Sequence, residues 1–126
     1  MISNQYSVLI VDDEKSIRQV VSRMLGDKYT VIEAIDGDMA LDMAHRYKPD
    51  IILMDIMMSK VDGYIACSKI KNDQATKHIP IVMITAVGQG LNRKLAYAMG
   101  AEGYITKPFT QQDLLDEIFR LVEIPK

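Results

Sequence analysis

Hydrophobic residues along the chain gather in short runs, separated by longer segments with apolar positions at helical spacing. The runs are rich in β-branched residues and predict five strands, over Tyr6–Val11, Thr30–Ala34, Asp50–Met54, Ile79–Ile84 and Glu102–Thr106. The first and third runs are apolar without alternation, which is typical of strands that helices cover on both faces. We therefore expect these two strands in the middle of a parallel sheet.

The segments between the strands predict five amphipathic helices. The first places Ile17, Val20, Val21, Met24 and Leu25 on one face and ends at Gly26. The others are expected over about Gly37–Tyr47, Gly63–Lys71, Gln89–Met99 and Gln111–Val122. Their inward residues are predicted to be Ala40, Leu41, Ala44, Ile65, Ala66, Ile70, Leu114, Leu115, Ile118, Leu121 and Val122. Five strands alternating with five helices imply right-handed crossovers and a doubly wound α/β sandwich.

Composition narrows the class of protein. With 126 residues, 48% of them hydrophobic, residues 1–126 are expected to form a single domain that folds without disulfides or a structural metal. The single cysteine, Cys67, excludes an internal disulfide. A net charge of −2 argues against direct binding of nucleic acid, and no apolar stretch suggests a signal peptide or a membrane contact. We expect a cytoplasmic protein.

Polar residues that could bind a ligand or take part in a reaction follow the predicted strands, where functional groups gather in open α/β sheets. They are Asp12-Asp13-Glu14, Asp36-Gly37, Asp55, Thr85-Ala86 and Lys107-Pro108. Asp12, Asp13 and Asp55 follow two strands that should be neighbours, so their carboxylates should lie close together. His45 and His78 follow no strand, and we assign them no chemistry.

Three converging carboxylates need a partner, because two like charges 4 Å apart repel by roughly 4 kcal/mol at an effective dielectric of 20. A hard divalent cation relieves this repulsion, and Mg²⁺ fits best, with Mn²⁺ as an alternative. The simpler interpretation is that Asp12 or Asp13 caps the first helix. With Lys107 and Thr85 nearby, the set suggests a phosphoryl site in which the Asp55 carboxylate is itself the nucleophile.

The order of these parts resembles the receiver domain of two-component response regulators. The matching segments are Val8-Leu9-Ile10-Val11-Asp12-Asp13-Glu14, Asp50 to Met58, Asp62-Gly63, Ile84-Thr85-Ala86 and Gly100 to Phe109. Each segment alone is weak evidence, but five in this order, each at the expected strand end, form a specific pattern that spans nearly the whole chain.

The resemblance implies a flavodoxin-like sheet in the order 2-1-3-4-5, with Asp55 as phosphoacceptor. Asp12, Asp13, Asp55 and the backbone carbonyl of Met57 would bind Mg²⁺, and Thr85, Ala86 and Lys107 would bind the phosphoryl group. Thr85 and Tyr104 would form the switch, and the bond before Pro108 would be cis. The alternative for Tyr104 is a half-buried aromatic residue with no such role.

The resemblance also implies partners. A histidine kinase or histidine phosphotransfer protein would supply the phosphoryl group. An output protein, or a domain beyond this chain, would respond to the surface of the fourth helix, fifth strand and fifth helix. We expect a monomer and leave open whether phosphorylation causes dimerisation. The protein would be a regulator that catalyses only its own phosphorylation and dephosphorylation.

Three other interpretations remain in view. A flavodoxin-like FMN carrier would need a hydroxyl- and amide-rich loop where this chain has Asp12-Asp13-Glu14. A phosphatase with an aspartate nucleophile would need an acid two residues after it, and Asp55 is followed by Ile56-Met57. A receiver-like interaction domain that works without phosphorylation would not need the intact set of acids, threonine and lysine.

Overall fold

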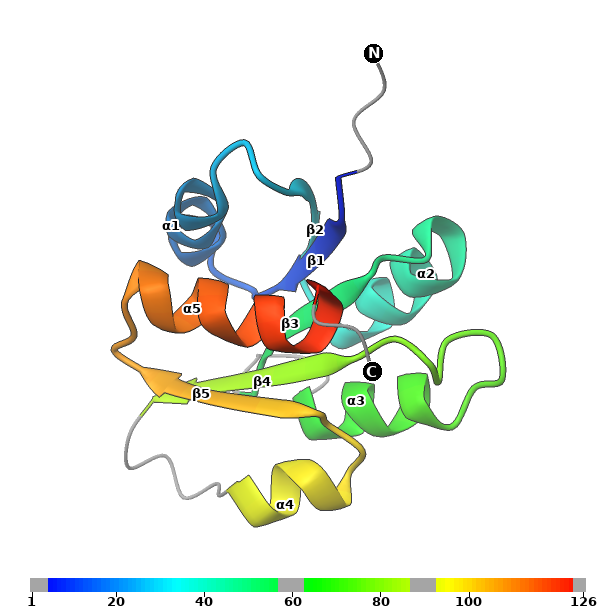
Figure 1. The fold of residues 1–126 in the computed structure, drawn as a ribbon. Coiled ribbons are helices and arrows are strands. Elements are labelled where there is room, and N and C mark those ends of the chain that lie inside the picture. Colours follow the sequence, from blue (N-terminus) through cyan, green and yellow to red (C-terminus); the bar gives the residue numbers. More distant parts are fainter. Residues whose placement is uncertain (1–4, 57–62, 87–92, 124–126) are drawn as a thin grey trace.

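The computed structural model describes residues 5–56, 63–86 and 93–123, and its centre is one parallel sheet (Figure 1). The strand order is β2-β1-β3-β4-β5, as predicted. The strands are β1 (Ser7–Val11), β2 (Thr30–Ala34), β3 (Ile51–Asp55), β4 (Ile81–Ala86) and β5 (Gly103–Lys107). The predicted middle strands β1 and β3 pair with each other, and β3 is buried along its whole length.

Helices cover both faces of the sheet (Figure 1). They are α1 (Lys15–Leu25), α2 (Gly37–Tyr47), α3 (Gly63–Lys71), α4 (Arg93–Ala98) and α5 (Gln111–Ile118), and α5 continues into a π-helical turn, η1 (Phe119–Glu123). One hydrophobic core joins α1 and α5 to alternate strand residues such as Ile10 and Leu53. The other joins α2, α3 and α4 to the intervening residues, such as Leu9 and Met54. The predicted doubly wound sandwich is therefore confirmed.

The predicted boundaries are close to the observed ones. The second strand and the second helix match residue for residue, whereas β3, β4 and β5 lie one or two residues further along the chain than predicted. Asp55, Ala86 and Lys107 are consequently the last residues of their strands, whereas the prediction placed them just beyond the strands. The predicted start of the fourth helix, Gln89, falls outside the described residues.

For two residues, the prediction that the side chain points inward is wrong. Val20 is 43% exposed and Ile65 is 50% exposed. At about 100° per residue, Val20 lies to one side of the buried stripe that Val21 and Leu25 form. Ile65 lies opposite Cys67 and Ile70, which are buried. The first turn of α3 is apolar all round, so hydrophobicity could not identify its inner face.

No helix among the described residues is long and apolar enough to cross a membrane.

The polar residue at the start of α2 caps that helix and does not belong to the acidic cluster. Asp36, predicted to be among the functional strand-end residues, is the N-cap of α2, and its carboxylate accepts a hydrogen bond from the Met39 amide at 2.8 Å.

Candidate functional site

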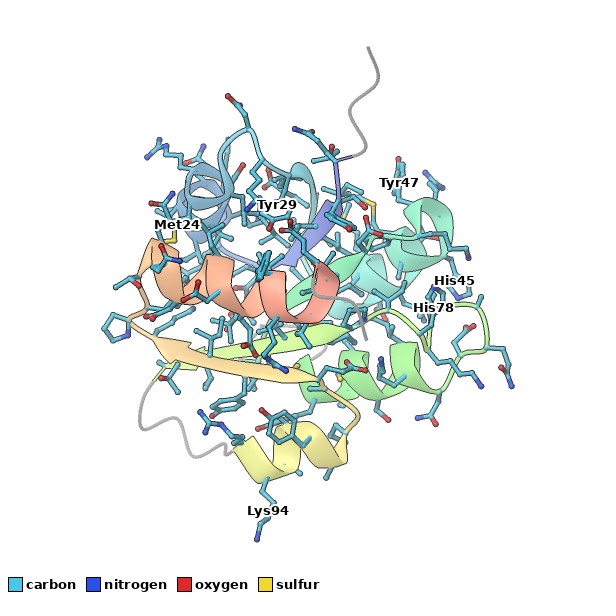
Figure 2. All side chains as sticks on the ribbon, viewed as in Figure 1. Met24, Tyr29, His45, Tyr47, His78 and Lys94 are labelled. Atoms are coloured by element: carbon cyan, nitrogen blue, oxygen red, sulfur yellow. The ribbon has the colours of Figure 1, made fainter. Side chains whose placement is uncertain are left out.

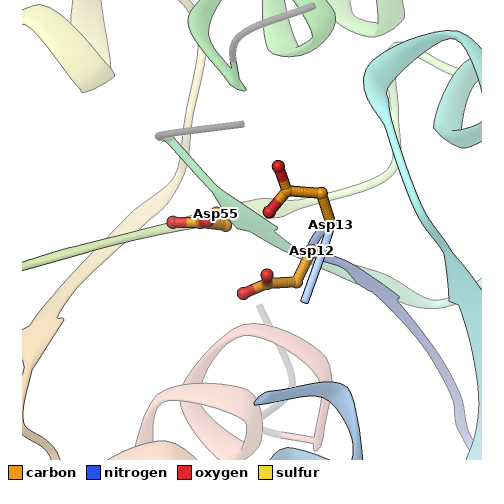
Figure 3. Close-up of side chains that lie close together, drawn as sticks. All are labelled: Asp12, Asp13 and Asp55. Carbon is orange, nitrogen blue, oxygen red and sulfur yellow. The ribbon is translucent and has the colours of Figure 1, made fainter. Parts of the chain in front are cut away.

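Three carboxylates meet at the carboxyl ends of β1 and β3. Val11 pairs with Met54 in the parallel register, so Asp12 and Asp55 follow as neighbours across the two strands. Asp13 is the next residue in the loop to α1. One carboxylate oxygen from each of the three residues lies within 4.8 Å of the others, and Figure 3 shows the side chains gathered at one place. The structure confirms the predicted acidic cluster.

Two of the three acids are buried. Asp12 is 3% exposed and Asp55 is 6% exposed, whereas Asp13 is more open to solvent. Burial raises the pKa of Asp12 above its usual value, and the charges of Asp13 and Glu14 raise it further. A hydrogen bond from the Glu14 amide and the charge of Lys107 lower this pKa without cancelling the rise. The folded protein therefore disfavours the charged form of Asp12 relative to water.

Lys107 brings a positive charge to the cluster from the end of β5. Its Nζ atom lies 3.7 Å from Oδ1 of Asp55 and 4.0 Å from Oδ2 of Asp12. The backbone bond between Lys107 and Pro108 is cis, as the resemblance implies. A lysine contacting two carboxylates at these distances can also reach an anion placed between them.

Capping of α1 does not explain the acids. The residue at the N-cap position is Glu14, and its side chain makes no capping hydrogen bond. The Asp12 carboxylate instead accepts a hydrogen bond from the backbone N–H of Glu14 at 2.9 Å. This bond uses one oxygen of Asp12, and Asp55 comes from another strand, so the start of α1 does not explain why the two buried acids lie together.

Thr85 and Ala86 end β4 beside the acids. Ala86 pairs with Lys107 on β5, so β4 and β5 end level with each other, and Asp55 at the end of β3 pairs with Ile84, the residue before Thr85. Thr85 is 1% exposed, and its hydroxyl lies 3.4 Å from the Ala86 carbonyl oxygen. A contact this long is weak, so the hydroxyl can turn to a stronger acceptor.

Tyr104 and Thr85 share one face of the sheet. Met83 pairs with Tyr104 and Thr85 pairs with Thr106, and residues two apart on a strand point the same way. This is the face that α4 covers, and Tyr104 is half-buried there with the Arg93 guanidinium 5.4 Å from its ring centre. A displacement of Thr85 would therefore be felt on the face that holds the Tyr104 ring.

Gly63 is a site residue whose role the sequence did not reveal. It begins α3, and its amide donates to the Ile56 carbonyl at 2.9 Å. A Cβ atom at this position would lie 2.5 Å from the backbone oxygen of Asp55 and 2.8 Å from the Ile56 Cα atom. Only glycine lets the helix start this close to the backbone of the acid, and the sequence signal was no more than a glycine after an aspartate.

The two histidines and the cysteine lie away from the cluster. His45 and His78 are at the amino-end side of the sheet (Figure 2), and His45 Nε2 lies 2.8 Å from an oxygen of Asp73. Cys67 is fully buried in α3, and burial raises the pKa of its thiol to about 12. A thiol in this environment stays protonated and unreactive at neutral pH.

The donor set suits a hard cation and a phosphoryl group. Two ligands on opposite sides of a Mg²⁺ ion lie about 4.2 Å apart, close to the limit within which the three oxygens fall. The Met57 carbonyl, the fourth predicted ligand, lies outside the described residues. An acid at the end of a buried strand, next to a lysine and a hydroxyl, has the arrangement of a nucleophile with its electrostatic support.

The chain is similar to proteins of one family. The family model described as "Response regulator receiver domain" matches residues 8–119. The response regulator PleD of Caulobacter vibrioides is 43% identical over 102 residues, which are 80% of this chain and 22% of that protein. The chain spans between about a fifth and a half of the length of the first curated relatives it matches.

Solved structures agree with this family in fold. The chemotaxis protein CheY4 of Vibrio cholerae has a TM-score of 0.85 and 35% identity, and the match covers 93% of this chain and 98% of that chain. The receiver domain of the sensor histidine kinase PA1611 of Pseudomonas aeruginosa has a TM-score of 0.87 and 29% identity, covering 95% of this chain and 99% of that one. That structure holds a magnesium ion coordinated in its active site cleft.

Proposed function

The chain belongs to the response regulator receiver domain family of two-component systems, and from this premise we propose that Asp55 accepts a phosphoryl group. The observation that carries the proposal is the cluster itself: three acids with oxygens within 4.8 Å, and a lysine 3.7 Å from Asp55. A receiver domain is a switch, and in this one the modified group is a buried carboxylate at the end of β3.

The reaction is a phosphoryl transfer to oxygen. An Asp55 carboxylate oxygen attacks the phosphorus atom of a phosphohistidine, forming an O–P bond while the N–P bond breaks, and the leaving imidazole takes up a proton. Lys107 and the Thr85 hydroxyl approach the new oxygens, with Ala86 as a neighbouring backbone contact. Water later cleaves the acyl phosphate, which returns the carboxylate and releases phosphate.

Asp12, Asp13 and Asp55 would hold a Mg²⁺ ion, with Mn²⁺ as an alternative. When bound, the ion supplies positive charge that neutralises the acids and the equatorial phosphoryl oxygens. The fit rests on the oxygen donors, their spacing and the raised pKa of Asp12, and the magnesium-bound receiver domain of PA1611 supports it by similarity. The Met57 carbonyl would complete the protein's ligands.

The switch would act through Thr85 and Tyr104. Phosphorylation adds nearly two negative charges, which draw the Thr85 hydroxyl toward the acceptor and leave space on the face of the sheet below α4. The Tyr104 ring would move into that space and away from Arg93. A surface depression of about 400 Å³ beside this ring is lined by residues of α4, β5 and α5, and the output partner would contact it.

The partners follow from the same chemistry. A histidine kinase or a histidine phosphotransfer protein would donate the phosphoryl group, and an output protein or domain would read the switch. One relative, RpaA of Synechocystis, is named a DNA-binding transcriptional regulator. This chain matches 48% of its length, and we assign no nucleic-acid contact to the residues described here. The chain would catalyse only its own phosphorylation and dephosphorylation.

Intact mass spectrometry after incubation with acetyl phosphate and Mg²⁺ tests the acceptor. We expect the native chain to gain one phosphoryl group and Asp55→Asn to gain none. Asp50→Asn is the matched control, because Asp50 lies immediately before the other end of the same strand. It should be phosphorylated like the native chain, and EDTA should abolish the gain in both.

Two results would contradict the proposal. Phosphorylation of Asp55→Asn would move the acceptor to another residue. A folded native chain that binds Mg²⁺ and yet gains no phosphoryl group would favour an interaction domain that works without phosphorylation.

A further inference from the structure

The backbone of Asp12 is held from two sides. Its N–H donates to the Ala34 carbonyl of β2 at 3.1 Å. Its carbonyl accepts a hydrogen bond from Nη1 of Arg18, on α1, at 2.8 Å. This carbonyl belongs to the peptide plane between Asp12 and Asp13. Because a peptide unit is planar and rigid, fixing its oxygen also fixes the amide nitrogen of Asp13. The direction in which both acids leave the chain depends on that plane.

Arg18 is itself fixed in place. Its side chain is 12% exposed, and its Nε atom donates to Oε1 of Glu33 on β2 at 2.8 Å. Glu33 is the residue before Ala34, so β2 supplies both the acceptor for the Asp12 amide and the anchor for the guanidinium. The side chain of a helical residue leans toward the helix N-terminus, which brings Arg18 back over the loop that carries the acids.

We propose that Arg18 is a positioning residue for the metal and phosphoryl site. Through its bonds to the Asp12 carbonyl and Glu33, it sets the peptide plane from which the carboxylates of Asp12 and Asp13 project. The proposal rests on the proposed function of the acids as metal ligands. Mg²⁺ requires nearly ideal octahedral geometry, so small errors in ligand direction reduce its affinity. Groups that orient metal ligands in this way typically change affinity 10- to 100-fold when removed.

Arg18 acts on the backbone and not on the charge of the acids. The guanidinium meets the Asp12 carbonyl with one nitrogen and has its own charge balanced by Glu33 with another. A planar guanidinium holds two acceptors in fixed directions, which a lysine ammonium does not. Retaining the charge alone should therefore not restore the site.

The test compares Arg18→Met, Arg18→Lys and Glu33→Gln with the native chain. Arg23→Met is the matched control, because Arg23 lies on the same helix and is exposed in its last turn. Two quantities are measured: the Mg²⁺ dissociation constant by calorimetry, and hydrogen exchange of the Glu14 amide in metal-free protein by NMR. The second quantity reports the hydrogen bond from that amide to the Asp12 carboxylate without any metal.

For Arg18→Met we expect about tenfold weaker Mg²⁺ binding and about tenfold faster exchange of the Glu14 amide. Arg18→Lys and Glu33→Gln should show smaller changes in the same direction, and Arg23→Met should stay within twofold of the native chain in both quantities. If Arg18→Met fails to fold, Arg18→Lys decides. An Arg18→Lys chain equal to the native chain would overturn the proposal, as would a folded Arg18→Met chain that matches Arg23→Met.

The two proposals can fail separately. A native chain that does not bind Mg²⁺ would contradict the metal site of the proposed function. Exchange of the Glu14 amide in metal-free Arg18→Met would still decide whether Arg18 orders the loop. Faster exchange would support that role, and unchanged exchange would overturn it.

Discussion

At the amino ends of the strands, opposite charges pair directly with one another, whereas at the carboxyl ends three carboxylates gather at one place. Lys71 at the amino-end side pairs with Glu102 at 2.6 Å and also donates to the Ile79 carbonyl at 2.8 Å. The second Glu102 oxygen accepts the Ile81 amide at 2.8 Å. This small network joins α3 to the starts of β4 and β5. Its charges are used for stability.

The carboxyl-end side has the opposite balance. Asp12 and Asp55 are buried next to Asp13, and Lys107 approaches the buried pair at 3.7 to 4.0 Å. The raised pKa of Asp12 records the cost of keeping that charge out of water. The two sides of one sheet therefore differ in what their charges do. Charged groups stabilise the fold at the amino ends of the strands, whereas at the carboxyl ends they lower its stability and form the proposed functional site.

Breaking the network at the amino-end side should have the largest effect on stability. Lys71→Met leaves Glu102 without its cation and the Ile79 carbonyl without a donor. We expect a loss of about 2–3 kcal/mol in the free energy of unfolding, measured by urea denaturation. Lys69→Met, an exposed lysine on the same helix, should change it by less than about 0.5 kcal/mol. Equal losses of stability in the two variants would show that the Lys71–Glu102 network does not stabilise the amino-end side of the sheet.

An Asp→Asn substitution should change the free energy of unfolding in opposite directions at the carboxyl-end and amino-end sides of the sheet. Asp12→Asn removes a charge that burial disfavours, together with its repulsion by Asp13 and Glu14, and it loses the attraction to Lys107. We expect a net gain of about 1 kcal/mol in metal-free protein. Asp50→Asn weakens the hydrogen bond that the carboxylate accepts from the Ser7 amide at 2.8 Å. It should lose about 0.5–1 kcal/mol, and destabilisation by both substitutions would contradict the comparison.

The gain in Asp12→Asn should depend on pH. Burial raises the pKa of Asp12 above 3.8, so between that value and its pKa in the folded protein the native state binds more protons than the unfolded state. Native stability therefore falls as the pH rises through this window, relative to the variant. The advantage of Asp12→Asn should be absent below pH 3.8 and complete once the pH exceeds the pKa of Asp12 in the folded protein. Urea denaturation of both chains in EDTA across this range measures it.

The smallest effect is expected at the exposed pair on the amino-end side. His45 and Asp73 lie 2.8 Å apart with side chains 41% and 32% exposed. Solvent screens such a pair, so His45→Gln should change the free energy of unfolding by no more than about 0.5 kcal/mol. Thermal unfolding is sensitive enough to detect a shift of this size. A loss as large as that of Lys71→Met would show that solvent exposure does not explain the difference in strength between the His45–Asp73 and Lys71–Glu102 pairs.

The sequence could predict the fold because its pattern is clear in these elements. The apolar runs of β1 and β3 are typical of buried strands, and the apolar residues of α2 recur at helical spacing. It could predict that the acids, Thr85 and Lys107 lie near one another, because the carboxyl ends of parallel strands meet on one side of the sheet. It could not find the inner face of α3, because Tyr64, Ile65 and Cys67 are all apolar. Nor could it reveal Gly63 or Arg18, whose roles depend on a close backbone approach and on a hydrogen bond to a carbonyl.

The effect of Mg²⁺ on the free energy of unfolding tests most directly whether the carboxyl-end side is a site that a cation completes. In the native chain and in Lys71→Met, Mg²⁺ at ten times its dissociation constant should add about 1.4 kcal/mol relative to EDTA. Asp13→Asn should gain much less at the same concentration. A native chain that is equally stable in EDTA and in saturating Mg²⁺ would contradict the claim.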